Sequence, residues 1–415
     1  MTRGNKNVAL TLLCVFTLSG CVEEKHNADV PRGMSAERLS RIDTVMKEHV
    51  DSGRIAGVTT LVARDGELVH FETVGKLNLD SGEDLKPDSL FRIASMTKPI
   101  VTTAAMILLE DGSIRLQEPV AKYLPAFEDV KVLVDDELVP AKRNFTIQQL
   151  MSHTAGFTYG FFDDTKVDQM YLKEGIFSSS NLNEFIESLA AMPLRYQPGT
   201  EWVYSVSVDV LGALIEVVSG QPLDEYLDQR IFTPLGMDDT FFEIPMDKMH
   251  RLGTTHSLND DGELVVDQRP DDGRYTDVTM LWGGGGLVST AEDYLRYAQM
   301  MLNGGELDGV RIVSKKTVEL MTTDQLTRSI REKNGGEDQF PENWGFGLGF
   351  GLSVGQPLNR LGSVGEFSWA GADGTLFWID PAEGLVAISL LQQEYGQVGS
   401  VQEQFRNLVY QAIIE

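Results

Sequence analysis

Val58-Thr59-Thr60-Leu61-Val62-Ala63 is a run of β-branched and apolar residues, and Leu68-Val69-His70-Phe71 is a second one. Arg64-Asp65-Gly66-Glu67 lies between them, and an Asp-Gly pair in that position predicts a β-hairpin. The other end of the chain repeats the pattern, because Thr375–Ile379 and Leu385–Leu390 flank a short turn. Two strand pairs at opposite ends of the sequence predict one antiparallel sheet built from both termini.

Helices are predicted at both ends and through the middle of the chain. Residues 36–50 place their apolar side chains on one helical face, and a last helix is expected at about residues 398–414. The predicted fold class is therefore α+β, an α/β sandwich with helices against the sheet. Its sheet subdomain would comprise residues 36–92 and about 280–415, and a mostly helical subdomain would be inserted at about residues 93–279.

The first residues have the pattern of a targeting segment. Arg3 and Lys6 precede an apolar run, Val8 to Leu18, that is too short to span a bilayer. Residues 1–20 are therefore predicted to be a signal peptide.

The end of this segment resembles a bacterial lipobox, Leu18-Ser19-Gly20-Cys21. An ordinary signal peptide followed by a chance Cys is the alternative. The lipobox predicts that Cys21 becomes the first mature residue and carries lipid, with the polar residues 21–35 as a tether. Val22, rather than Asp, after the Cys resembles outer-membrane sorting, so we expect a lipid anchor in the bacterial envelope, facing the periplasm.

Composition excludes several classes of function. The net charge is −27, which argues against nucleic acid and anionic membrane surfaces as partners. Cys14 and Cys21 are the two cysteines, so no disulfide and no Cys–zinc site are expected in the mature chain. No metal-binding motif is visible, and neither a metal nor a cofactor is expected. The sequence leaves the oligomeric state open.

Ser95-Met96-Thr97-Lys98 is the one Ser-x-x-Lys motif in the sequence. Apolar helix-forming residues follow from Ile100 to Leu109, and Asp111-Gly112 ends the run. The two side chains should therefore share one face of a helix's first turn. Pro99 is compatible only with a helix start, and it suggests an opening turn that is not fully α-helical.

This placement suits nucleophilic catalysis. A serine hydroxyl is a poor nucleophile until a base removes its proton. The positive end of a helix and partial burial both favour an uncharged Lys98 amine, which can act as that base. The backbone N–H of Ser95 can face an oxyanion. A capping Ser followed by a solvated Lys is the alternative.

Two further segments carry candidate groups. Tyr204 follows a Pro-Gly turn and lies just before a predicted helix, where its phenol can face a cleft and relay a proton. Residues 366–375 lead into a strand, and Gly371 within them permits close backbone approach. The backbone N–H of Ala372 is a candidate second oxyanion donor.

The order Ser-Met-Thr-Lys-Pro, then Tyr-Ser, then Trp-x-Gly resembles the class C β-lactamase-like serine hydrolases, and within them the family VIII carboxylesterases. The supporting stretches are Glu118–Pro125, Leu150–Phe157, Pro198-Gly199-Thr200 and Gly285–Thr290. The resemblance covers residues 36–412, and it implies a β-lactamase/transpeptidase-like domain over residues 36–415. It also implies an acyl-enzyme mechanism in which Ser95 is the nucleophile and Lys98 the base, with Tyr204 assisting proton transfer and Trp369 lining the acyl site.

Two positions depart from the lactam- and peptide-cleaving members of that family. Val206 stands where they commonly have Asn, and Trp369 stands where they have Lys or His. The missing amide would bind a substrate amide, and the missing cation would bind a substrate carboxylate. We therefore expect a carboxylesterase acting on small or medium neutral esters. The alternatives are a β-lactamase, a D-stereospecific peptidase or amidase, and a non-catalytic envelope lipoprotein.

Other motifs are rejected. Gly351-Leu352-Ser353-Val354-Gly355 matches a nucleophile elbow, but no helix start and no His follow it. Lys333 lies in a polar segment, and His153 is expected to make structural hydrogen bonds. Whether the insert at residues 128–143 covers the site stays open.

Overall fold

The computed structural model describes Met1 and residues 33–267, 275–333, 343–357 and 359–415. The predicted signal peptide, the Cys21 lipidation site and most of the predicted tether lie outside the described residues. Within the described part of the chain, no helix is both long enough and apolar enough to cross a membrane.

The centre of the fold is an eight-stranded antiparallel sheet in the order β12-β13-β14-β15-β16-β1-β2-β3. The two hairpins predicted from the ends of the sequence meet there, because Arg64 of β1 pairs with Leu385 of β16. The prediction of one sheet from both termini is therefore confirmed. Its strands are β1 (Gly57–Arg64), β2 (Glu67–Asn78), β3 (Glu83–Asp84), β12 (Trp344–Phe346), β13 (Gly351–Ser353), β14 (Phe367–Ala370), β15 (Leu376–Asp380) and β16 (Leu385–Leu390).

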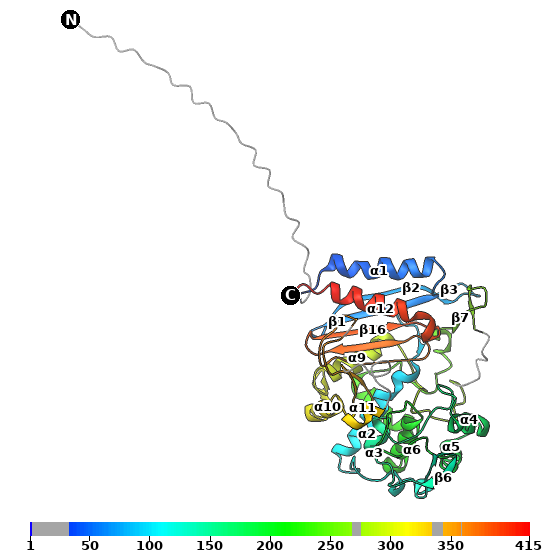
Figure 1. Ribbon diagram of the computed structural model, residues 1–415. Helices are drawn as coiled ribbons and strands as arrows, with labels where there is room; N and C mark the ends of the chain where they lie inside the picture. Colours follow the sequence, from blue (N-terminus) through cyan, green and yellow to red (C-terminus); the bar gives the residue numbers. More distant parts are fainter. Residues whose placement is uncertain (2–32, 268–274, 334–342, 358) are drawn as a thin grey trace.

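Helices cover both faces of this sheet (Figure 1). Alternate strand residues point to opposite faces. Val62 and Trp378 share a core cluster with residues of the terminal helices α1 (Ala36–Asp51) and α12 (Tyr395–Gln411). Leu61, Phe377 and Ile388 point the other way and belong to the cluster that includes α9, Ala291–Leu302.

The cluster that contains Leu61 and Phe377 continues from the sheet into the helical part of the chain. The two parts therefore share one core, and the subdomain boundaries drawn from the sequence stay predictions. The helices of this part and its surroundings are α2 (Thr97–Glu110), α3 (Ile147–Met151), α4 (Lys166–Glu174), α5 (Leu182–Ala191), α6 (Ser207–Ser219), α7 (Leu223–Leu227), α8 (Thr233–Leu235), α10 (Lys315–Met321) and α11 (Arg328–Lys333).

Short two-stranded pairs complete the fold: β4 (Phe91–Arg92) with β9 (Val288–Ser289), β5 (Lys131–Val134) with β6 (Glu137–Pro140), β7 (His256–Leu258) with β8 (Leu264–Val266), and β10 (Glu306–Leu307) with β11 (Val310–Arg311). The β4–β9 pair matters most for the site, since β4 ends three residues before Ser95.

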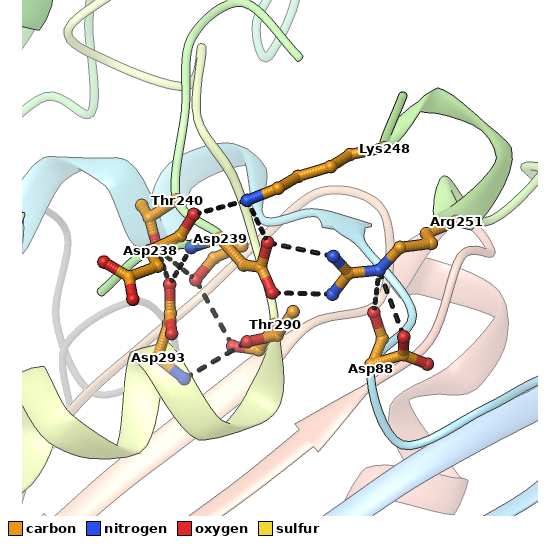
Figure 2. Close-up of polar contacts among 9 residues, drawn as sticks. Asp88, Asp238, Asp239, Thr240, Lys248, Arg251, Thr290 and Asp293 are labelled. Carbon is orange, nitrogen blue, oxygen red and sulfur yellow. Dashed lines mark hydrogen bonds and ion pairs between the residues drawn. The ribbon is translucent and has the colours of Figure 1, made fainter. Parts of the chain in front are cut away.

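A polar network fixes the segment beside β4 and β9 (Figure 2). Arg251 binds both carboxylate oxygens of Asp239, at 2.9 and 2.7 Å, and its Nε donates to the carbonyl of Asp88 at 2.8 Å. The backbone N–H of Asp239 and the hydroxyl of Thr240 both donate to one carboxylate oxygen of Asp293, at 2.7 and 2.9 Å. We call these residues the Arg251 network. It ties residues 88 and 238–251 to the start of α9.

Candidate active site

Ser95 lies in a tight turn between β4 and α2. Residues Ala94–Met96 form one 3₁₀ turn, and α2 begins directly afterwards at Thr97. Ala94 has a φ of 42°, an unfavourable value for a residue with a Cβ, and strain of this kind concentrates at functional sites. The predicted irregular opening of this helix is confirmed. It presents Ser95 to solvent at the N-terminal end of α2.

Lys98 is buried beneath Ser95 and is only 1% exposed. Its Nζ donates to Ser95 Oγ at 3.1 Å and to the carbonyl oxygen of Gly284 at 2.5 Å. The amine is thus directed at the hydroxyl, and no carboxylate of the described residues is in contact with it. The position and direction of the amine are those that a base for the Ser95 hydroxyl requires.

The same glycine connects Lys98 to a buried carboxylate. The N–H of Gly284 donates to Asp209 Oδ1 at 2.7 Å, while its carbonyl accepts from Lys98. A Cβ on Gly284 would lie 2.5 Å from Asp209 Oδ2, so only glycine permits this approach. Burial raises the pKa of Asp209 to about 6, and the nearby positive charge of Lys98 opposes that rise.

Tyr204 completes the polar group around Lys98. The Nζ of Lys98 lies 4.6 Å from the centre of the Tyr204 ring. The indole Nε1 of Trp369 donates to the Tyr204 hydroxyl at 3.3 Å. Because that hydroxyl accepts a hydrogen bond from Trp369, the orientation of the Tyr204 phenol is fixed.

His153 supports Tyr204 from behind. Its Nδ1 accepts from the backbone N–H of Ser205 at 3.3 Å, and the rings of His153 and Tyr204 are 4.8 Å apart. Burial, and then the charge of Lys98, lower the pKa of His153 well below its ordinary value, so the ring stays neutral. The structural hydrogen bonds expected of His153 are confirmed.

The two predicted oxyanion donors lie on different chain segments. Among the described residues, neither the N–H of Ser95 nor that of Ala372 has an internal acceptor, and both residues line the same cavity. The N–H of Gly371 is occupied by the carbonyl of Thr375, at 2.8 Å. A Cβ on Gly371 would lie 2.5 Å from the carbonyl of Ile93, so this glycine lets the end of β14 approach the Ser95 turn. The N–H of Gly371 is therefore not available to a ligand, whereas the N–H of Ala372 is, so Ala372 stays the predicted second donor.

The cavity above Ser95 has a volume of about 590 Å³, within the range of small-molecule sites. Tyr204, Asp209 and Ala372 line it with Ser95. Trp369 and Val206 do not line it: Trp369 lies behind Tyr204, and Val206 is fully buried. No residue of the insert at 128–143 lines the cavity, so in this structure the insert leaves the site open.

The other motifs stay away from this cavity. Ser353 ends β13 and its hydroxyl accepts from Arg360 at 2.8 Å, with no helix start after it. Lys333 is the last residue of α11. Within the described ranges, no group of three or more His, Cys, Asp or Glu side chains is arranged to hold a metal ion.

Sequence reasoning missed three contributors: Asp209, the carbonyl of Gly284, and the ring of Tyr159, which lies 5.3 Å from Lys98 Nζ. Asp209 did have a signal. It is a lone acid in the otherwise apolar run Val208–Leu211, five residues after Tyr204. A carbonyl contributed by a distant glycine has no such signal.

Comparison with known proteins identifies the family. The family model described as β-lactamase matches residues 42–411. The chain belongs to this family. It is 35% identical to an uncharacterised protein of Mycobacterium tuberculosis over 356 residues, covering 84% of this chain and 88% of the relative. It is 29% identical to the esterase EstB of Burkholderia gladioli over 403 residues, covering 91% and 96%.

Among solved structures, EstCE1, described as a hydrolase with promiscuous acyltransferase activity, superposes with a TM-score of 0.78. It is 26% identical, and the alignment covers 90% of this chain and 99% of EstCE1. The predicted fold class and the resemblance to β-lactamase-like serine hydrolases are confirmed. This β-lactamase family member therefore has the fold of a serine hydrolase superfamily that includes esterases.

Proposed function

We propose that this protein is a carboxylesterase that hydrolyses small or medium uncharged esters through an acyl-enzyme on Ser95. The observation that carries the proposal is the 3.1 Å contact between Lys98 Nζ and Ser95 Oγ at the base of an open cavity. Nucleophile and base within hydrogen-bond reach are the minimum arrangement for this chemistry.

In the proposed mechanism, Ser95 Oγ attacks the ester carbonyl as its proton passes to Lys98, with Tyr204 relaying it to the leaving alkoxide. The N–H groups of Ser95 and Ala372 hold the oxyanion of the tetrahedral intermediate. The alcohol leaves with the proton, and the acyl group stays on Ser95. Water then attacks the acyl-enzyme with the same base, which releases the carboxylic acid and regenerates Ser95.

The charge of the site supports esters over β-lactams. The ionisable carboxyls that line the cavity are Asp209 and Asp277, and no Lys or Arg side chain of the described chain lines it. A β-lactam or D-alanyl peptide carries a carboxylate, for which the described lining offers no Lys or Arg side chain as a partner. Trp369 stands where the resemblance leads us to expect a cation. The similarity to the esterase EstB supports this choice.

The test is hydrolysis of p-nitrophenyl butyrate by the purified full chain, beside Ser95→Ala and, as a matched control, Ser353→Ala. We expect turnover by the parent and by Ser353→Ala, and a loss of about 10³-fold or more in Ser95→Ala. Faster turnover of a chromogenic cephalosporin or a D-alanyl peptide would replace the esterase proposal with one of the alternatives. If no substrate is turned over, the non-catalytic lipoprotein is favoured.

We also propose that Cys21 anchors the enzyme to the envelope through lipid. The support is the lipobox-like sequence before it. In fractionated bacteria, Cys21→Ser should move the protein from the membrane fraction to the soluble periplasmic fraction. Retention of the variant in the membrane would contradict the anchor.

A further inference from the structure

One wall of the cavity is aromatic and unusually exposed. Phe161, Phe162 and Phe177 line the cavity and are 55%, 61% and 39% exposed. Three large apolar side chains exposed next to one another in a cavity indicate a binding surface. Burying each of them under a ligand would be favourable by about 1.5–3 kcal/mol.

The exposed rings connect directly to the candidate catalytic group. The ring centres of Phe161 and Phe162 are 4.7 Å apart, and Phe162 lies 5.8 Å from Tyr204. On the other side, Phe161 lies 5.7 Å from Phe177, and Phe177 lies 5.6 Å from Trp282. The aromatic wall formed by these rings therefore runs without a break from the reacting centre to the mouth of the cavity.

The segment that carries Phe161 and Phe162 is held by polar contacts beside them. Thr158 and Thr165 both donate to the carboxylate of Asp168, which is buried. Arg195 binds Asp163 at 2.6 Å. The two Phe side chains are thus exposed on an anchored segment, which presents them at a fixed place rather than letting them collapse into the core.

We propose that the aromatic wall is a specificity subsite that binds an apolar, ring-bearing group of an uncharged ester. This inference rests on the proposed function and adds the substrate class. Aromatic side chains gain from stacking on a ring beyond simple burial of area. The carboxyls of Asp209 and Asp277 in the same cavity select against an anionic group.

The test compares four esters by titration of the acid released at constant pH. Methyl acetate is the small reference. Methyl 3-phenylpropanoate carries a ring in the acyl group, 2-phenylethyl acetate carries one in the alcohol, and monomethyl succinate carries a carboxylate. The parent should prefer at least one phenyl ester over methyl acetate in kcat/KM, and should turn over monomethyl succinate most slowly.

The decisive variant is Phe161→Ser combined with Phe162→Ser, with Leu172→Ser as the control. Leu172 is 56% exposed on α4 and does not line the cavity. The double variant should lose about 10- to 100-fold in kcat/KM on the preferred phenyl ester and less than about twofold on methyl acetate. Which phenyl ester suffers the loss identifies the acyl or the alcohol side. Equal loss on all esters, or no loss on either phenyl ester, would overturn the subsite.

A binding measurement separates this inference from the proposed function. Ser95→Ala protein is titrated with 2-phenylethyl acetate and with methyl 3-phenylpropanoate, with and without the two Phe substitutions. Phe-dependent binding of either ester in a protein whose parent hydrolyses no ester would keep the subsite and reject the esterase. Ester hydrolysis without Phe-dependent binding would keep the esterase and reject the subsite.

Discussion

Oppositely charged side chains are in direct contact in the Arg251 network but are separated by a glycine in the site around Ser95. In the network, Arg251 and Lys248 contact Asp239 directly (Figure 2). Burial opposes ionisation there, but these hydrogen bonds outweigh it and lower the pKa of Asp239. In the site, Lys98 and Asp209 do not touch; each is bonded to a different end of Gly284.

This difference separates a structural group from a reactive one. Paired charges satisfy each other and stabilise one conformation of the segment beside β4. In the proposed mechanism, the separation of Lys98 and Asp209 by Gly284 lets Lys98 take the proton of Ser95 while Asp209 stabilises the positive charge that results. Four substitutions test this distinction, in order of decreasing effect on activity.

Lys98→Met should have the largest effect. Removing the base should lower kcat by about 10³-fold on p-nitrophenyl butyrate. Stability should be unchanged or improved, because a buried polar amine is replaced by an apolar side chain of similar length. Urea unfolding and steady-state kinetics on the same preparation measure both. A large fall in stability with kcat retained would make Lys98 a structural residue.

Asp209→Asn should change the pH dependence of activity, and Asp293→Asn is its matched control. Burial raises the pKa of both carboxyls to about 6. Below that pH the parent loses the charge of Asp209, so kcat should fall on the acid side. In Asp209→Asn, kcat should no longer fall near pH 6, and its maximum should be about tenfold lower than that of the parent. Asp293→Asn should keep the pH profile of the parent. Identical profiles for the two variants would remove Asp209 from the mechanism.

The same two carboxyls affect stability with a defined sign. Their folded-state pKa lies above the unfolded value of 3.8, so the folded chain binds these protons more tightly. The stability that each carboxyl contributes to the folded state is fully present below about pH 4 and is lost as the pH rises through about 6. The loss amounts to up to about 3 kcal/mol for each carboxyl. Either Asn variant should therefore lose less stability than the parent between pH 4.5 and 7.5 in urea unfolding.

Trp369→Phe should have a moderate effect. It removes the Nε1 donor to the Tyr204 hydroxyl but keeps an aromatic ring. We expect kcat to fall about 3- to 10-fold with KM nearly unchanged, which corresponds to one neutral hydrogen bond. Trp344→Phe is the control, since the Trp344 ring contacts Trp202 and Phe346, among others, and does not bond to Tyr204. A change confined to KM would return Trp369 to the acyl site that the family resemblance implied.

Arg251→Met should affect activity least and stability clearly. It leaves Asp239 without its two-point partner, at a cost of about 1–3 kcal/mol. Activity per folded molecule at low temperature should stay within about threefold of the parent. If kcat falls as far as in Asp209→Asn, the two regions are coupled and the comparison between them fails.

Local patterns in the sequence were enough for most of the fold. The Asp65-Gly66 turn gave the β1–β2 hairpin, and the predicted helices at 36–50 and 398–414 correspond to α1 and α12 within a few residues. Ser95 and Lys98 were found because both lie on one helical turn. Local turns made Tyr204 and Ala372 candidates, but only the family's motif order placed them beside Ser95.

The remaining features depend on contacts between distant segments. Gly284 is 186 residues from Lys98 and contributes only backbone atoms, so no side-chain pattern reveals it. The bond from Trp369 to Tyr204 joins residues 165 apart, and sequence reasoning placed Trp369 in the acyl site instead. The aromatic wall is inconspicuous in the sequence because Phe residues usually belong to a core.

The most direct test of the central claim is the identity of the acylated atom. The full chain is treated with a p-nitrophenyl alkylphosphonate, which releases p-nitrophenol and leaves a stable bond between phosphorus and the nucleophile, and the adduct is located by peptide mass spectrometry. The account predicts one adduct, on Ser95, that persists in Ser353→Ala and disappears in Ser95→Ala. An adduct on Ser353 or another residue, in a protein that hydrolyses esters, would contradict it.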